Sequence, residues 1–237
     1  MSILLRPPGL GQVGARTVGT FEPVALTLTL DAALSACSAA LVRDDIVIAQ
    51  RDVALDHGQA AILPALVEEM LRIGAPDVVA VTVGPGSFTG LRLALSLAHG
   101  VALGSGCQLV AVSMGEVFAQ APVGAGERRI WTAIDSRRGP IFLEIEGVVR
   151  SVLVEQVAVP DEPVAVAGDA APDIAGWLTT CGADVMLTDL RSATPGLVAR
   201  AAARRLSGAL DGRAAVPVYV EPALTRRSGR SQRPRPA

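Results

Sequence analysis

The sequence predicts an α/β protein in which mixed β-sheets carry helices on their faces. Short apolar runs, rich in Val, Ile and Ala, recur along the chain and are typical of buried strands. In the first half three of them follow one another with short connections, which favours an antiparallel meander. Later runs alternate with helical segments, which favours parallel pairing. The stretch APVGAGE at residues 121–127 then predicts a boundary between two subdomains.

The first subdomain, residues 24–122, is expected to hold one sheet and two helices. Its apolar runs predict strands at residues 24–31, 36–43, 46–52, 78–83 and 109–113. Helices are predicted at 57–73 and at 89–103, the second with Ser87 as its N-cap. Residues 1–23 contain no long apolar run and are expected to be a flexible N-terminal extension without a signal peptide.

The second subdomain, residues 123–222, is expected to repeat the alternation of strands and helices. Strands are predicted at residues 129–134, 140–146, 152–157 and 164–167, and helices at 171–180 and 194–210. The prolines of PVYVEP, residues 217–222, indicate a final piece at a sheet edge. Residues 223–237 are rich in Arg, Pro and Ser and are expected to be a disordered tail, because such a composition cannot bury a core.

Composition excludes several classes of function. The chain has 237 residues, 50% of them hydrophobic, yet no apolar run reaches the roughly 18 residues that a membrane-spanning helix needs. All 21 basic residues are Arg, so neither a Walker A lysine nor a Schiff-base lysine exists. Aromatic residues make up 3%, too few for a platform that stacks nucleic-acid bases. Three widely spaced cysteines without a CxxC motif predict a reduced, cytoplasmic protein.

One glycine-rich loop joins a predicted strand to a predicted helix and allows two interpretations. It comprises Gly84, Pro85, Gly86, Ser87, Phe88, Thr89 and Gly90, followed by Leu91 and Arg92. The free N–H groups of a helix that starts in such a loop attract anions, so the loop could cradle the phosphates of a ligand. Glycine is equally useful in a tight corner that only directs the chain from strand to helix. The loop alone does not decide between the two.

The two helices that flank this loop carry more apolar surface than one sheet can cover. Ile62, Leu66 and Met70 form one stripe of the helix at 57–73, and a second apolar stripe lies beside it. In the helix at 89–103 small residues recur at spacing four, which allows another helix to approach closely. These are Gly90, Ala94 and Ala98. We expect ordinary packing within one domain or, alternatively, an interface with another chain along these two stripes.

The sequence gives little support for a metal site or for a catalytic nucleophile. The two histidines, His57 and His99, are far apart, and no HxxxH, HExxH or Cys/His cluster exists, so no metal site and no cofactor are expected. Ser87 is not part of a GxSxG elbow, so no catalytic residue is assigned. Asp31 and Asp135 end predicted strands in the two halves and could together hold a magnesium–phosphate complex, or each could cap a turn.

Four segments resemble the TsaB (YeaZ) family. GPGSFTGLR at residues 84–92 is similar to the family's hallmark loop, and LTLDAALSACSAALVRDD at 28–45 resembles its opening strand pair. WTAIDSRRGPIFLEI at 131–145 and PVYVEP at 217–222 are similar to two later segments of the family. The four occur in the family's order and span most of the chain.

The resemblance implies an actin-like (ribonuclease H-like, ASKHA) fold with two subdomains. It further implies a non-catalytic, cytoplasmic subunit of the complex that forms N6-threonylcarbamoyladenosine at position 37 of tRNA. The implied partners are a TsaD-like transferase and a TsaE-like ATPase; a homodimer is a further expectation. tRNA would be bound only through the complex, and no membrane is involved. In the catalytic paralogue two histidines hold a metal where this chain has Met114 and Phe118, which do not replace imidazole.

The chain also departs from the family pattern. Asp31 is followed by Ala32 and Ala33 where Thr and Ser are usual, and Pro140 replaces the usual Glu after Gly139. The missing hydroxyl groups weaken a nucleotide-binding interpretation. They favour a glycine loop that directs a partner-binding helix, with any binding of nucleotide or metal at Asp31 and Asp135 residual. The alternative function is an ATP-binding phosphotransferase or ATPase of the same actin-like superfamily.

Overall fold

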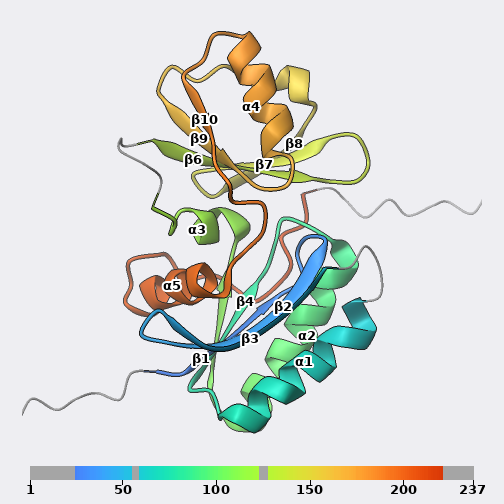
Figure 1. Ribbon diagram of the computed structural model, residues 1–237, viewed down its shortest axis with the longest axis vertical. Helices are drawn as coiled ribbons and strands as arrows, with labels where there is room; N and C mark the ends of the chain where they lie inside the picture. Colours follow the sequence, from blue (N-terminus) through green and yellow to red (C-terminus); the bar gives the residue numbers. More distant parts are fainter. Residues whose placement is uncertain (1–24, 55–58, 123–127, 221–237) are drawn as a thin grey trace, which may run out of the picture.

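The computed structural model describes residues 25–54, 59–122 and 128–220. Two five-stranded sheets lie toward opposite ends of the long axis of the molecule (Figure 1). The predicted N-terminal extension, His57 and the predicted Arg-rich tail lie outside the described residues.

The first sheet has the strand order β3-β2-β1-β4-β5. Its strands are β1 (Thr27–Asp31), β2 (Ala36–Arg43), β3 (Ile46–Ala54), β4 (Val78–Thr82) and β5 (Gln108–Val112). β1, β2 and β3 pair antiparallel, while β4 pairs parallel with both β1 and β5. β4, which lies between β1 and β5, is buried along its whole length, which explains why its sequence VVAVT is almost continuously apolar.

The second sheet repeats this arrangement with the strand order β10-β9-β6-β7-β8. Its strands are β6 (Arg129–Asp135), β7 (Ile141–Ile145), β8 (Val148–Val152), β9 (Val164–Ala167) and β10 (Val185–Leu187). Again a three-stranded antiparallel meander comes first, and two parallel strands extend the sheet beyond its first strand. The prediction of two mixed sheets is confirmed.

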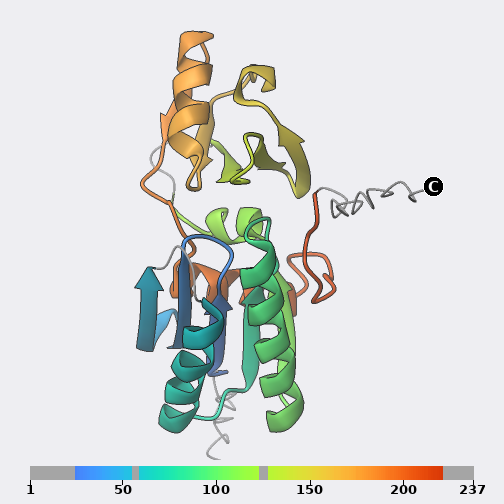
Figure 2. The ribbon, with the colours of Figure 1, turned by 90° about the vertical axis from the view of Figure 1, so that its right-hand side faces the viewer.

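Helices form three layers around the sheets (Figure 2). α1 (Gln59–Ile73) and α2 (Phe88–Ser105) cover one face of the first sheet, and α4 (Ala171–Thr180) covers the outer face of the second. The short α3 (Met114–Phe118) and α5 (Pro195–Leu206) lie between the two sheets. The core therefore has three parts, one under α1 and α2, one around α3 and α5, and one under α4.

Several predicted elements differ from the observed ones. α5 falls within the range predicted for the second subdomain, residues 123–222, but it packs on the first sheet. The strand predicted at 152–157 is instead β8, which ends at Val152 and is followed by a 3-10 turn at Val154–Gln156. The described part of the predicted edge piece at 217–222 forms no strand, although the Val218 N–H donates to the Val83 carbonyl at 2.8 Å. α3 and β10 were not predicted.

Candidate functional site

The glycine loop connects the buried end of β4 to the start of α2. Ser87 is the N-cap of α2, and its Oγ accepts a hydrogen bond from the Gly90 N–H at 3.2 Å. The N–H of Ser87 donates to the Ala33 carbonyl at 2.7 Å. Two N–H groups of the loop are therefore bonded within the chain, which leaves fewer donors for a bound phosphate than a free helix start would offer.

Two glycines of the loop are needed because the backbone of another turn lies against them. A Cβ on Gly90 would lie 2.0 Å from the Ala32 carbonyl oxygen, and one on Gly86 would lie 2.2 Å from that of Ala33. The space under the loop is filled by the turn between β1 and β2, whose Ala32 and Ala33 are buried. The loop is thus pressed onto the chain's own backbone, and this contact sets the direction of α2.

The outer surface of the loop presents an aromatic and cationic cluster. The Arg92 guanidinium lies 3.8 Å from the centre of the Phe88 ring, and its Nε donates to the Tyr219 hydroxyl at 2.8 Å. The two rings are 5.5 Å apart between centroids. Phe88 and Tyr219 are 45% and 51% exposed. Because large aromatic and arginine side chains dominate the energetics of protein interfaces, this Phe88–Arg92–Tyr219 cluster has the chemistry of a contact site.

The predicted interface stripes mostly point inward, so that part of the prediction is wrong. Leu66, Met70, Ala94 and Ala98 are buried in the core between the helices and the first sheet. Gly90 is buried against the β1–β2 turn, and only Ile62 is half-buried. Small residues at spacing four on α2 let this helix approach the sheet closely rather than a helix of another chain.

The outward face of α2 is made of other residues. Arg92, Ser96, His99 and Leu103 are exposed, and Leu103 has 87% of its surface accessible. The extended segment after α5 runs beside this face, where the ring Nε2 of His99 lies 3.1 Å from the Ala215 carbonyl oxygen. The surface that α2 offers to another molecule is therefore this row together with Phe88.

Asp31 lies at the end of β1 and borders a cleft of about 360 Å³. The cleft is also lined by Ser38 and Gln50 of the first sheet and by Thr194 and Gly196 at the start of α5. Oδ1 of Asp31 accepts hydrogen bonds from the Thr82 hydroxyl and from the Ala33 N–H. Burial outweighs these hydrogen bonds and raises the pKa of Asp31 to about 6.

Asp135 is held by a different set of contacts. Its Oδ1 accepts from the Arg137 N–H at 2.7 Å, and its own N–H donates to Oδ1 of Asp169 at 2.9 Å. Asp135 does not border the cleft at Asp31, so the predicted pair of carboxylates does not line one common pocket. Within residues 25–54, 59–122 and 128–220 there is no cluster of three or more His, Cys, Asp and Glu side chains that could hold a metal ion.

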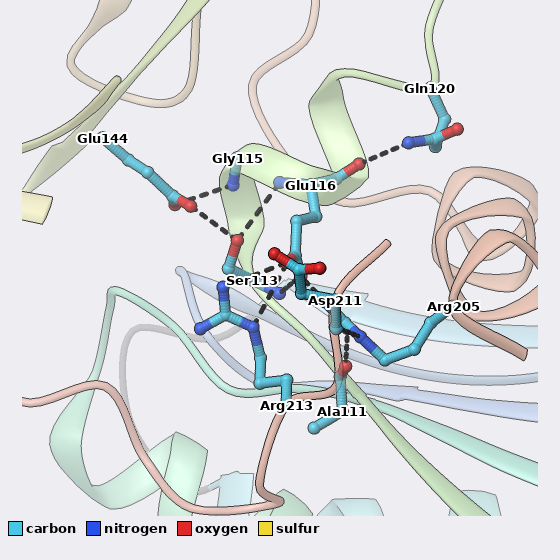
Figure 3. A network of polar contacts seen from close by, with 9 residues as sticks. All are labelled: Ala111, Ser113, Gly115, Glu116, Gln120, Glu144, Arg205, Asp211 and Arg213. Carbon is cyan, nitrogen blue, oxygen red and sulfur yellow. Dashed lines mark hydrogen bonds and ion pairs between the residues drawn. The ribbon is translucent and has the colours of Figure 1, made fainter. Parts of the chain in front are cut away.

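A second polar centre lies where α3 meets the second sheet and was not found from the sequence (Figure 3). Ser113 and Glu116 form a capping box at the start of α3, and Oε1 of Glu116 also binds the guanidinium groups of Arg205 and Arg213. Glu144 of β7 accepts hydrogen bonds from the Ser113 hydroxyl and the Gly115 N–H. The spacing Ser-x-x-Glu at 113–116 is a recognisable helix-start signal that could have located α3.

Two apolar residues of α3 fill the space between the sheets. Met114 and Phe118 are fully buried in the central part of the core, together with side chains of α5 and of both sheets. These positions, where the resemblance implies histidines in the catalytic paralogue, are core positions here.

Sequence relatives point to one family. The chain is 34% identical over 124 residues to the tRNA threonylcarbamoyladenosine biosynthesis protein TsaB of Escherichia coli K12, a match covering 48% of this chain and 52% of that protein. The protein of the same name from Haemophilus influenzae is 28% identical over 154 residues, which cover 58% of this chain and 65% of its own length. The matched segments thus span about half to two thirds of these relatives. The chain is similar to proteins of the TsaB (YeaZ) family.

Two further comparisons agree with this similarity. The family model for TsaD, tRNA N6-adenosine threonylcarbamoyltransferase, matches residues 56–167. YeaZ from Pseudomonas aeruginosa has a TM-score of 0.62 at 24% identity. This match covers 82% of the present chain and 99% of the YeaZ chain. A Pseudomonas aeruginosa protein described as similar to peptidase YeaZ has a TM-score of 0.65 at 24% identity. This match covers 83% of the present chain and 100% of the Pseudomonas chain. The chain therefore shares the fold of these YeaZ structures, with two mixed sheets. No helix among the described residues is both long and apolar enough to span a membrane.

Proposed function

We propose that the chain is a non-catalytic scaffold and dimerisation subunit of the complex that forms N6-threonylcarbamoyladenosine at position 37 of tRNA. It binds and supports a TsaD-like transferase, with a TsaE-like ATPase as a third component, and meets tRNA only through the complex. The observation that supports this proposal best is the relationship to proteins named for threonylcarbamoyladenosine biosynthesis. Met114 and Phe118 add support. They stand where the catalytic paralogue is expected to have metal-binding histidines, and here both are apolar and buried in the core.

The partner surface that we propose is the outward face of α2 with the Phe88–Arg92–Tyr219 cluster. This face replaces the buried stripes that the sequence suggested. It combines two exposed aromatic rings, an arginine stacked on one of them and the exposed Leu103. Such a mixture of apolar, aromatic and arginine side chains is typical of the centre of a protein interface.

Binding to the TsaD-like protein of the same organism tests the proposal. Wild-type chain and partner should elute together on gel filtration, with or without ATP. Arg92→Glu and Leu103→Glu should each weaken the complex by tenfold or more while leaving the melting temperature within a few degrees. Arg150→Glu, an equal charge reversal at an exposed position of β8, should bind like wild type. If wild type never binds the partner, the scaffold function is wrong; if it binds and both variants do too, only the surface is wrong.

A second candidate, an ATP-binding phosphotransferase or ATPase, has one observation in its favour. The cleft beside Asp31 is polar and is bordered by the start of a helix. However, Ala32 and Ala33 carry no hydroxyl group, and Oδ1 of Asp31 already accepts hydrogen bonds from the Thr82 hydroxyl and the Ala33 N–H. We expect the purified chain to show no ATP turnover and to contain no stoichiometric zinc or iron, as measured by phosphate release and elemental analysis. Turnover that Asp31→Asn abolishes would establish the second candidate instead.

A further inference from the structure

The two halves of the molecule are linked by one buried carboxyl group. Glu144 belongs to β7 of the second sheet, and only 2% of its surface is accessible. One carboxylate oxygen accepts a hydrogen bond from the Ser113 hydroxyl at 2.6 Å, and the other accepts from the Gly115 N–H at 2.8 Å. Both donors lie at the start of α3, which leads away from β5 of the first sheet (Figure 3). Glu144 therefore bonds across the junction with both of its oxygens.

The link is close-packed as well as polar. A Cβ on Gly115 would lie 2.4 Å from Cδ of Glu144, so the carboxyl group occupies the place of the missing side chain. Neither group can shift far while the junction stays closed, and separating the sheets would expose Glu144 to water.

No cation of the described residues forms an ion pair with Glu144. The guanidinium groups of Arg205 and Arg213 both bind Oε1 of Glu116, and Arg213 attracts Glu144 only without direct pairing. Glu144 also borders a second cleft, separate from the one at Asp31. Further charged side chains line this second cleft, namely Arg128, Arg129, Arg204 and Glu146. Arg128 pairs with Asp184, Arg129 with Glu146 and Glu162, and Arg204 bonds to Gln120.

The neighbouring strand does not supply a hydrogen bond either. Thr132 of β6 lies directly opposite Glu144 in the sheet register. Its hydroxyl is buried, and among the described residues it has no hydrogen-bond partner. Among the described residues, the ionised form of Glu144 is therefore held by two hydrogen bonds and by the charge of Arg213, which does not pair with it directly, while the Glu116 carboxylate repels it.

These surroundings act differently on the two acids. Burial raises the pKa of Glu144 and outweighs the hydrogen bonds from Ser113 and Gly115 and the attraction of Arg213, and the Glu116 carboxylate raises this pKa further. Burial also acts on Glu116, but there the bonds from Arg205, the Ser113 N–H and Arg213 prevail and hold the pKa below its ordinary value. Glu116 thus stays ionised while Glu144 takes up a proton more readily than a solvated glutamate.

We propose that Glu144 is a proton-linked latch between the two sheets, whose neutral form closes the junction and whose ionised form loosens it. The direction of the pH dependence follows from the difference between the pKa of Glu144 in the open and in the closed form. With the sheets apart, Glu144 is solvated and titrates near its ordinary pKa of 4.5; with them closed, it holds its proton to higher pH. Protonation therefore favours closure. The stabilisation of the closed junction by this proton is complete at a pH below the ordinary pKa of glutamate. It is lost as the pH rises through the raised pKa that Glu144 has in the closed form.

The distance between two spin labels on the full-length chain tests the latch. One label goes on Cys181, which is exposed beyond α4, and the other on Leu103→Cys at the exposed side of α2, in a Cys107→Ser background. Electron-spin distance measurements should give a narrow distribution at pH 5 and a clearly broader one at pH 8.5. Glu144→Gln, which mimics the neutral acid, should be narrow at both values.

The matched control is Glu146→Gln, an exposed glutamate two residues further along the same chain segment, which should keep the wild-type response. Protection of the α3 amide groups in hydrogen exchange provides a second readout, and it should follow the same pattern. A wild-type distribution that does not change with pH overturns the proposal. So does a Glu144→Gln variant that is folded and still broadens at pH 8.5.

Discussion

Gly90 shows how one missing side chain can set the position of a helix. Its Cα faces the Ala32 carbonyl oxygen so closely that a methyl group would lie 2.0 Å away. Because backbone atoms cannot rotate aside as a side chain can, any larger residue must displace either the β1–β2 turn or the first turn of α2. The glycine loop therefore acts in this chain through packing between backbones.

Gly90→Ala should lower the free energy of unfolding by about 1–3 kcal/mol, because the added methyl group strains a closely packed contact. Gly100→Ala is the matched control on the same helix, where a Cβ would meet nothing within 4 Å. There the better helix propensity of alanine should raise the free energy by about 0.5–1 kcal/mol. Urea unfolding of both variants measures the difference, and equal effects would contradict the packing role of Gly90.

Asp31 should make stability depend on pH, since burial raises its pKa from 3.8 to about 6 in the folded protein. Its contribution is fully present below pH 4 and is lost as the pH rises through about 6. Relative to Asp31→Asn, the wild type should lose on the order of 2–3 kcal/mol of unfolding free energy between pH 4 and pH 7. Urea titrations at several pH values measure this, and parallel pH profiles of the two proteins would contradict the raised pKa.

At the scale of elements, periodicity identified the four longer helices, α1, α2, α4 and α5, but not which of their faces is buried. The bounds of β2, β9 and α4 agree with the prediction, because their apolar runs are bounded by clear turn residues. On α1 the buried face combines Leu63 and Val67 from one stripe with Leu66 and Met70 from the other. Two adjacent apolar stripes look alike in the sequence, and only the sheet decides which side is covered.

Two short elements and the polar junction escaped prediction for related reasons. α3 has five residues and β10 has three, which is too few for a period to emerge. Glu144 meets Ser113 across 31 positions, and Arg213 meets Glu116 across 97. Contacts over such separations depend on how the two sheets stack, which no local pattern encodes.

A substitution on each side of α2 tests which face of this helix is buried against the first sheet. Ala98→Arg should unfold the chain or lower its melting temperature strongly, because it forces a charge into the buried core. Leu103→Arg should leave the melting temperature within about 2 °C, since the side chain is 87% exposed. Thermal unfolding followed by circular dichroism compares the two. A stable Ala98→Arg protein would mean that the inner and outer faces of α2 are assigned incorrectly.

At the scale of the whole molecule, the same strand order occurs twice, and α3 and α5 fill the space between the two sheets. The sequence predicted two mixed sheets, but it placed α5 with the second one. The reason is that α5 follows the second sheet in the chain and returns to the first through space. This return ties both halves into one body and leaves the outer face of α2 open beyond the segment that runs beside it.

The level of N6-threonylcarbamoyladenosine in total tRNA tests the central claim most directly. Cells depleted of this chain should lose most of the modified adenosine, as measured by mass spectrometry of nucleosides. Wild-type chain should restore it, as should Asp31→Asn, whereas the partner-surface variant Arg92→Glu should restore it poorly at equal protein level. A depleted strain whose tRNA keeps its full content of the modified adenosine would contradict the account.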